Sequence, residues 1–137
     1  MTKYFAVIDT NVLVSAMLVP DSVPGTVLKY VYTSVIVPLI NEEIMNEYIE
    51  VINREKFGFD KNDIDLVISN IKNSALVLER TISDEQFDDQ KDVVFYEVAL
   101  TGINKTNAYL VTGNIKHFPK RPFVVTPREM VDIIENS

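Results

Sequence analysis

The sequence contains no cysteine and only one histidine in 137 residues. Without cysteine, a disulfide framework, a thiolate metal site and cysteine nucleophilic chemistry are all excluded. Long hydrophobic runs are also missing, since no segment approaches the roughly 20 apolar residues of a membrane-spanning helix. The apolar run near the start reaches Asp9 too soon to be the core of a signal peptide. We therefore expect a soluble, cytoplasmic protein with no membrane partner.

An excess of positive charge is lacking as well. The formal net charge at pH 7 is −7, whereas proteins that bind nucleic acid are usually basic. The charge is uneven, because residues 1–100 carry 8 Lys and Arg against 17 Asp and Glu, while residues 101–137 carry 5 against 3. If the acids hold divalent cations, the charge of the metal reverses the local sign. The negative net charge then does not argue against a nucleic acid as the partner.

Strand-like and helix-like segments alternate along the chain. Short apolar runs predict strands over 4–8, 35–37, 75–78, 109–111 and 123–125. Apolar residues at helical spacing predict helices over 12–18, 26–32, 41–52, 60–71, 89–102 and 127–134. We expect the second strand to stop at Pro38, the fifth helix to stop at Gly102, and residues 79–90 to form a loop. This alternation predicts one α/β domain over 1–137, with a parallel sheet and helices on both faces.

The first predicted strand ends on an acid, Asp9, which is followed by Thr10 and Asn11. Open α/β sheets form their ligand sites at the carboxyl ends of the parallel strands, which makes Asp9 a candidate site residue. Capping of the next helix explains the same residue types, because Asp, Thr and Asn are all favoured at helix N-caps. The residues alone leave both interpretations open.

Three further polar residues can reach the same edge of the sheet. Asn114 follows the fourth strand, and Asp92 lies in the first turn of the fifth helix, where capping is again the alternative. Glu47 lies nearly two turns into the third helix and on its apolar stripe, so that helix must tilt across the edge to bring it in. Glu43 lies in the first turn of the same helix, nearer the edge of the sheet, and is therefore an alternative to Glu47 as the site residue.

Three carboxylates and one carboxamide at one edge make an all-oxygen site. Hard oxygen ligands suit Mg2+ or Mn2+ better than zinc. Such an ion polarises a bound phosphate and lowers the pKa of a coordinated water until that water can attack phosphorus. The residues needed for a covalent mechanism are missing, because Ser15 has no paired base and His117 is interpreted as a loop or packing residue. The residues therefore predict metal-dependent hydrolysis of a phosphodiester.

Four segments resemble the motifs of PIN-domain ribonucleases, specifically the group of toxins from toxin-antitoxin systems. The first is Val7–Ala16 and the second is Glu43–Val51. The third is Asp89–Phe95 with Ala99, and the fourth is Leu110–Pro119. They follow one another in the family's order and span nearly the whole chain.

The resemblance implies an α/β/α sandwich around a parallel sheet of four or five strands. It also implies cleavage of single-stranded RNA with one or two Mg2+ or Mn2+ ions, a homodimer, and inhibition by a cognate antitoxin protein. The metal-binding and catalytic places of the family fall on Asp9, Glu47, Asp92 and Asn114. The residues that would orient these groups are Thr10, Asn11, Ser15, Asp89 and Thr112. Many relatives have Asp where this chain has Asn114, and an amide holds a metal ion more weakly than a carboxylate does.

The basic residues of the last third of the chain give it a modest positive surface. Our candidates for RNA contact are Lys116, His117, Lys120 and Arg121. The alternative for each is an ordinary solvated loop residue.

Two other functions are compatible with the same sequence. One is a phosphatase that uses Asp9 as its nucleophile, although Asn11 then stands where that family has its second Asp. The other is a weakly active or inactive module of the same fold that binds RNA or protein. Retention of three acids argues against the inactive module, whereas Asn114 and the acidic total favour it.

Overall fold

Five parallel strands form one sheet at the centre of the computed structural model, which describes residues 2–137. In sequence order they are β1 (Tyr4–Ile8), β2 (Ile36–Ile40), β3 (Leu76–Val77), β4 (Ala108–Val111) and β5 (Val124–Val125). Their spatial order is β3-β2-β1-β4-β5, so β1 is central. The register pairs Ile8 with Val111 and Ile40 with Val77. Because all pairs are parallel, the carboxyl ends of the strands lie along one edge.

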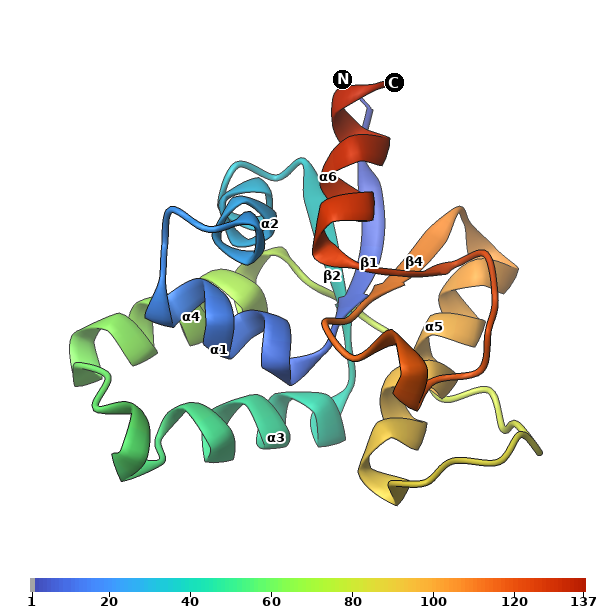
Figure 1. Ribbon diagram of the computed structural model, residues 1–137, viewed down its shortest axis with the longest axis horizontal. Helices are drawn as coiled ribbons and strands as arrows, with labels where there is room; N and C mark the ends of the chain where they lie inside the picture. The colour runs from blue at the N-terminus through green and yellow to red at the C-terminus, as the bar shows by residue number, and fades with distance from the viewer. Residues whose placement is uncertain (1) are drawn as a thin grey trace.

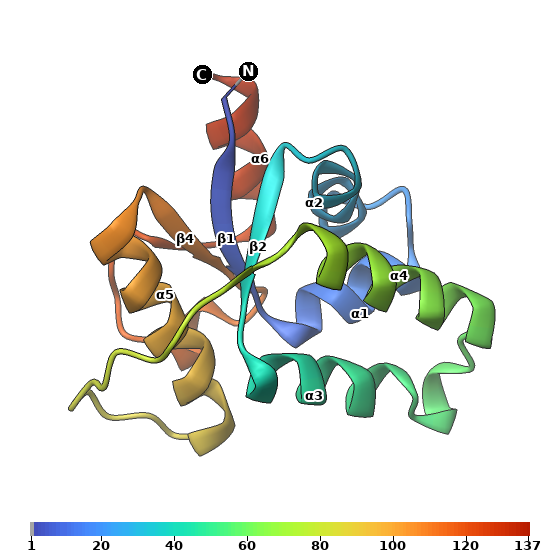
Figure 2. The same cartoon turned by 180° about the vertical axis from the view of Figure 1, so that it is seen from behind.

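Six α-helices and three short 3-10 turns connect these strands within the described residues. The helices are α1 (Thr10–Leu18), α2 (Val23–Tyr32), α3 (Glu42–Ile52), α4 (Lys61–Ser74), α5 (Val93–Lys105) and α6 (Pro127–Glu135). The turns are η1 (Glu55–Phe57), η2 (Gln90–Asp92) and η3 (Ile115–His117). Helix α5 packs on one face of the sheet, against β4, β1 and β2, and α6 lies on the opposite face (Figures 1 and 2). The predicted α/β fold with an all-parallel sheet is confirmed.

The central strand β1 is inaccessible to solvent at Ala6 and Val7, which are 0% exposed. Leu39 of β2 and Leu110 of β4 are equally buried on either side of it. A strand covered by helices on both faces is apolar throughout, and this explains the unbroken apolar run before Asp9. The same run carries Asp9 to the end of the most buried strand.

Strand β2 does not stop at Pro38, as we predicted, but continues to Ile40. Proline lacks the N–H that a central strand would donate. On the β3 side, however, pairing begins only at Leu39, so β2 is locally an edge strand at Pro38. The prediction was wrong because no strand lies beside Pro38 on that side to accept the hydrogen bond that proline cannot donate.

Helix α5 does not end at Gly102 either, and runs on to Lys105. A Cβ atom at Gly102 would lie 2.6 Å from Leu39 Cδ1 and 3.0 Å from Ala108 Cβ. Glycine is therefore needed here for close packing of the helix on the sheet, and it does not act as a stop.

Helix α2 begins at Val23, three residues before the predicted start. The Ser22 side chain accepts a hydrogen bond from the Gly25 amide at 3.2 Å and caps the helix, and Pro24 lies in the first turn, where proline is tolerated. What we interpreted as a turn before the helix is its N-terminus.

No single helix of residues 2–137 is both long and apolar enough to cross a membrane. Helices α1 and α2 together have the length and composition of a span, but they are bent by 100° at the break between them. Both bury apolar side chains in the core, such as Leu13 and Val27.

Candidate active site

Helix α3 runs across the carboxyl ends of β1 and β2 instead of along the strands (Figures 1 and 2). Tyr48 holds it there, because this side chain is 1% exposed and its hydroxyl donates to the backbone carbonyl of Ile8. Burial raises the pKa of Tyr48 far above its usual value, so the hydroxyl remains a donor. The neighbouring Glu47 is thereby brought to the edge of the sheet from the second turn of the helix.

Asp9 is 6% exposed and occupies the N-cap position of α1. Its side chain makes no capping hydrogen bond. Asp9 Oδ2 accepts instead from Thr112 Oγ1 at 2.7 Å and from Asn11 Nδ2 at 3.1 Å. The carboxylate is therefore oriented by the residue after β4 and by the first turn of α1, which favours the site interpretation of Asp9 over simple capping.

Two further hydrogen bonds join the end of β4 to this cluster. Asn114 N donates to Thr112 Oγ1 at 3.0 Å, and Gly113 N donates to Asn11 Oδ1 at 3.1 Å. Asn114 is exposed. The segment that follows β4 is thus fixed against Asp9 through Thr112 and Asn11.

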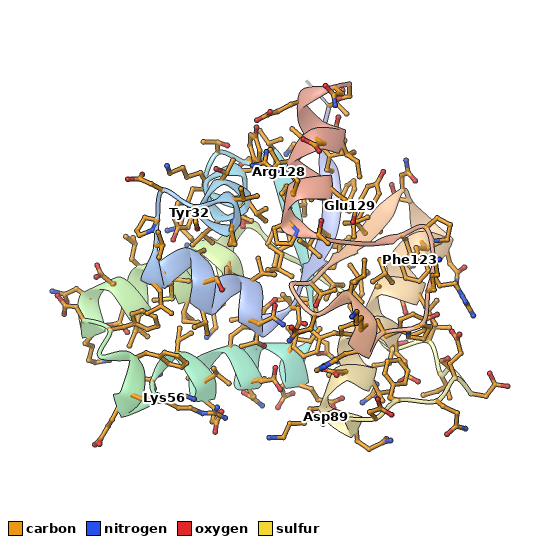
Figure 3. All side chains as sticks on the ribbon, viewed as in Figure 1. Tyr32, Lys56, Asp89, Phe123, Arg128 and Glu129 are labelled. Carbon is orange, nitrogen blue, oxygen red and sulfur yellow. The ribbon has the colours of Figure 1, made fainter. Side chains whose placement is uncertain are left out.

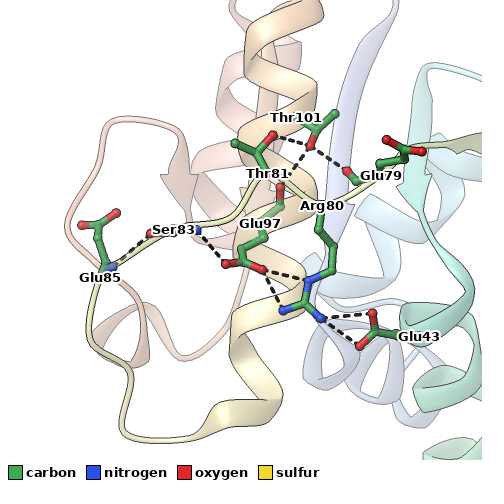
Figure 4. A network of polar contacts seen from close by, with 8 residues as sticks. All are labelled: Glu43, Glu79, Arg80, Thr81, Ser83, Glu85, Glu97 and Thr101. Atoms are coloured by element: carbon green, nitrogen blue, oxygen red, sulfur yellow. Dashed lines mark hydrogen bonds and ion pairs between the residues drawn. The ribbon is translucent and has the colours of Figure 1, made fainter.

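The two rival acids of α3 have different surroundings. Glu47 is partly buried and accepts a hydrogen bond from Thr10 Oγ1. Glu43 instead accepts from Arg80 Nη1 through both carboxylate oxygens, at 3.0 and 2.9 Å (Figure 4). Arg80 also binds the buried Glu97, with Nη2 2.7 Å from Oε1. The charge of Glu43 is therefore neutralised within the protein, whereas Glu47 has no Lys or Arg partner among the described residues.

Asp92 ends the η2 turn and does not cap α5 with its side chain. Its Oδ2 atom is the one buried side-chain oxygen or nitrogen in residues 2–137 without a hydrogen-bond partner. His117 Nδ1 lies 3.8 Å from this oxygen, at the limit of an ion pair. Asp89 caps the η2 turn, since its Oδ1 accepts from Lys91 N at 2.9 Å, and it lies at the lower end of the α5 segment in Figure 3. An unpaired buried carboxylate oxygen is costly, so Asp92 needs a ligand that is positive or donates a hydrogen bond.

The electrostatics of the three acids reflect their proximity. Burial is the main cause that raises the pKa of Asp9 from 3.8 to about 6, and the negative charges of Asp92 and Glu47 add to it. The hydrogen bond from Thr112 acts in the opposite direction. Burial also raises the pKa of Asp92, with further contributions from Asp89 and Glu47 and an opposing one from His117. These carboxylates repel one another, and none of the three forms an ion pair with a Lys or Arg of residues 2–137.

A cavity of about 380 Å3 opens between α1, α3 and η2. Six of the predicted site residues line it: Thr10, Asn11, Ser15, Glu47, Asp89 and Asp92. Its apolar wall is made of Val14, Val51 and Phe57. Asp9 lies beneath this lining, and Asn114 lies outside it.

Sequence reasoning missed two cations of this cavity, Arg54 and Lys91. Arg54 lies two residues beyond the end of α3 and pairs with Glu50, and Lys91 directly precedes Asp92. These spacings are the signals that could have found them. Of the predicted RNA contacts, His117 lies beside the site, with its Nδ1 3.8 Å from Asp92 Oδ2. Lys116 and Lys120 do not line the cavity, and Arg121 is paired with Glu85.

The donor set consists of carboxylate, hydroxyl and carboxamide oxygens, which fits a hard divalent cation. The buried, unpartnered Asp92 Oδ2 fits it as well. As the side chains stand, no group of three or more His, Asp or Glu residues in the described chain is arranged to hold an ion. Direct ligation therefore requires side-chain rotation toward the ion, or water between the ion and some of the acids.

Two comparisons with known proteins bear on this arrangement. The PIN domain family model matches residues 6–116, a range that contains all four predicted metal-site residues. An uncharacterized protein of Methanocaldococcus jannaschii is 27% identical over 150 aligned positions, which cover 97% of this chain and 93% of that protein.

Proposed function

The chain belongs to the PIN domain family, and from that premise we propose that it is an endoribonuclease that hydrolyses single-stranded RNA with Mg2+ or Mn2+. PIN domains are generally nucleases that use divalent metal ions. The choice of RNA, the single-stranded form and the two ions are our proposal, and they rest on the resemblance of the motifs and on the oxygen-only donor set.

The observation that carries the proposal is the unpartnered, buried Asp92 Oδ2 in a cavity shared with Glu47 and next to Asp9. Removing three carboxylates from water without a cation is unfavourable, and the raised pKa of Asp9 reports this cost. A divalent cation relieves it. The arrangement thus favours an ion-dependent reaction over one that uses the protein's own side chains alone.

Asp9, Glu47 and Asp92 would hold the ion, with Asn114 as a weaker, neutral donor at the rim. A bound Mg2+ or Mn2+ supplies polarisation of the phosphate and a water of lowered pKa. Thr112 and Asn11 keep the Asp9 carboxylate oriented, and Thr10 does the same for Glu47. Such groups hold the ligands in place before the substrate arrives.

The test is cleavage of an end-labelled single-stranded RNA with Mn2+, with Mg2+ and with EDTA. We expect cleavage only with metal, and a loss of at least about a hundredfold in Asp9→Asn and Asp92→Asn, because removal of a group that holds a catalytic ion removes the ion's stabilisation of the transition state. Asp65→Asn, on the exposed side of α4, is the matched control and should cleave like the wild type. Cleavage that survives EDTA or Asp9→Asn would contradict the mechanism.

We also propose, from the motif resemblance, that the protein is the toxin of a toxin-antitoxin pair and forms a homodimer. Its expression should then arrest growth, and the Asp92→Asn variant should not. Light scattering of the purified protein tests the dimer. Growth that is equally arrested by both proteins, or by neither, contradicts the toxin role.

The phosphatase alternative is less well supported. Asp9 is 6% exposed, and this burial hinders its attack on a substrate phosphate. Trapping a phosphoaspartate at Asp9 would favour it. An inactive binding module would show no affinity for Mn2+ that depends on Asp9 and Asp92.

A further inference from the structure

Two adjoining cavities share three lining residues, Glu47, Arg54 and Lys91. The first is the site cavity, and the second has a volume of about 370 Å3. The second is lined in addition by Glu43, Asn46, Glu50, Arg80, Gln90 and Val94. Because the shared residues belong to both, the cavities form one trough, which passes between the α3 segment and the η2 turn.

Apart from Asp89, which caps the η2 turn, the acids along this trough fall into two groups. Glu43 is paired with Arg80, and Glu50 is paired with Arg54. At the site end, Glu47 and Asp92 have no Lys or Arg partner in residues 2–137. A polyanion that enters the trough therefore meets its strongest uncompensated repulsion at the site.

Some N–H donors of the Arg54 guanidinium make no hydrogen bond within residues 2–137. Its Nη2 donates to Glu50 Oε1 at 3.1 Å and to Oε2 at 2.9 Å. The Nε and Nη1 groups make no hydrogen bond to any described residue, although a guanidinium carries five N–H donors. The Glu50 pair is exposed on both sides, so it holds the arginine only weakly.

Lys91 is exposed, and its ammonium group forms no ion pair with any described residue. Its backbone is nevertheless fixed, because its amide donates to Asp89 Oδ1. Lys91 is thus an exposed cation without an ion-pair partner in residues 2–137, on a capped turn immediately before Asp92. The two cations stand on the two walls of the trough, one from each segment.

We propose that Arg54 and Lys91 bind the RNA backbone phosphates that flank the scissile phosphate. This inference rests on the proposed function, and it replaces the predicted contacts at Lys116, Lys120 and Arg121. Positive side chains that neutralise phosphates supply most of the affinity of such complexes and little sequence preference. A protein of net charge −7 then needs only this local pair, together with the ion, to accept RNA.

The test measures binding separately from cleavage, by fluorescence anisotropy of a labelled single-stranded RNA at low salt, with Ca2+ in place of Mg2+ or Mn2+ so that a divalent cation accompanies the acids. We expect the Arg54→Gln/Lys91→Gln double variant to bind roughly tenfold more weakly or worse. The slope of log K against log salt should become shallower by about 0.7 for each phosphate that the variant no longer neutralises. The Lys72→Gln/Lys105→Gln control, at two exposed lysines that line neither cavity, makes the same change in net charge and should bind within about twofold of the wild type. The inference is overturned if the first double variant binds like the wild type, if the control weakens equally, or if the wild type binds no RNA.

A second variant distinguishes phosphate binding by Arg54 from a purely structural role of this residue. Glu50→Gln frees Arg54 Nη2 and removes a negative charge from the trough, so RNA binding should tighten about twofold to fivefold. In the Arg54→Gln background this gain should become smaller, because only the effect of the removed negative charge remains and no arginine is freed. An equal gain in both backgrounds would overturn the role of Arg54.

Cleavage is measured separately, so the two proposals fail separately. Binding that depends on Arg54 and Lys91, with no cleavage in Mn2+, supports the inference and overturns the ribonuclease. Metal-dependent cleavage with unchanged affinity in the double variant overturns the inference alone.

Discussion

Thr112 Oγ1 donates a 2.7 Å hydrogen bond to Asp9 Oδ2, across the pairing of β1 and β4. This bond favours the ionised carboxylate and opposes the effect of burial on the pKa of Asp9. The same hydroxyl accepts from Asn114 N. Thr112 therefore connects the protonation of one predicted metal ligand to the position of another.

Thr112→Val should raise the pKa of Asp9 further, by about one pH unit, because the carboxylate loses its strongest hydrogen bond. The acid limb of the pH profile of Mn2+ binding should move upward by the same amount, since the ion competes with the proton for Asp9. Titration of Mn2+ binding between pH 5 and 8 measures this. The control is Thr101→Val, whose hydroxyl lies away from the site, between Thr81 and Glu79. An unshifted limb in Thr112→Val would show that the bond does not tune Asp9.

In the absence of metal, Asp9→Asn should stabilise the protein at pH 7. The pKa of Asp9 is raised from 3.8 to about 6 on folding, so the folded state binds the proton more tightly than the unfolded state. Its contribution to stability is complete below about pH 4 and is lost as the pH rises through about 6. The substitution should therefore raise the free energy of unfolding at pH 7 by about 2 to 3 kcal/mol, and by much less at pH 4.

Chemical denaturation in EDTA at both pH values measures this effect, with Asp65→Asn as the exposed control. Saturating Mn2+ should reverse the order, because only the wild type gains stability from the ion. A variant that is less stable than the wild type at pH 7 in EDTA would contradict the cost that we assign to ionisation of the buried Asp9 carboxylate.

Glu47→Gln and Glu43→Gln form a matched pair on one helix. Glu47→Gln should weaken Mn2+ binding at least tenfold, because it removes a carboxylate that the site needs. Glu43→Gln should leave Mn2+ binding within about twofold, because the charge of Glu43 is already neutralised by Arg80. Calorimetric titration distinguishes the two. Equal losses would mean that the ion is held nearer the first turn of α3 than the geometry indicates.

Arg80→Ala should destabilise the fold by about 3 to 5 kcal/mol, because it leaves the buried Glu97 without its counter-charge. Ser83 N would remain as the one donor to the Glu97 carboxylate that Figure 4 shows apart from Arg80. Glu43→Gln removes the exposed partner of the same arginine and should cost less than about 1 kcal/mol. Urea denaturation of the two variants compares them. Similar costs would show that Glu97 is stabilised by something other than Arg80.

The sequence was sufficient for the fold because its pattern is simple. A buried strand that ends on Asp9, a capped helix after Asn41 and a proline at the start of α6 are local features, and each appears where it was predicted. Pro38 and Gly102 were misinterpreted because their roles depend on neighbours distant in the sequence. Pro38 is tolerated because β3 is short, and Gly102 is required because Leu39 and Ala108 lie against it.

The candidate site could be predicted only in part, for the same reason. Periodicity placed Glu47 on the apolar stripe, but the choice over Glu43 depends on the direction of α3 and on the distant Arg80. The position of Arg54 beside the acids depends on the same direction. The unpartnered oxygen of Asp92 is a property of packing that no local pattern reveals. The roles of Asp9, Glu47, Asp92 and Asn114 as metal ligands remain predictions.

The two outer strands of the sheet, β3 and β5, are only two residues long. Such short borders present few free amide and carbonyl groups, so a second molecule gains little by adding its own strand there. The sheet is therefore protected from edge-to-edge association with other copies, which leads to aggregates. Pairing of two copies by strand addition is thus disfavoured, and mutations that test a dimer belong outside the sheet edges.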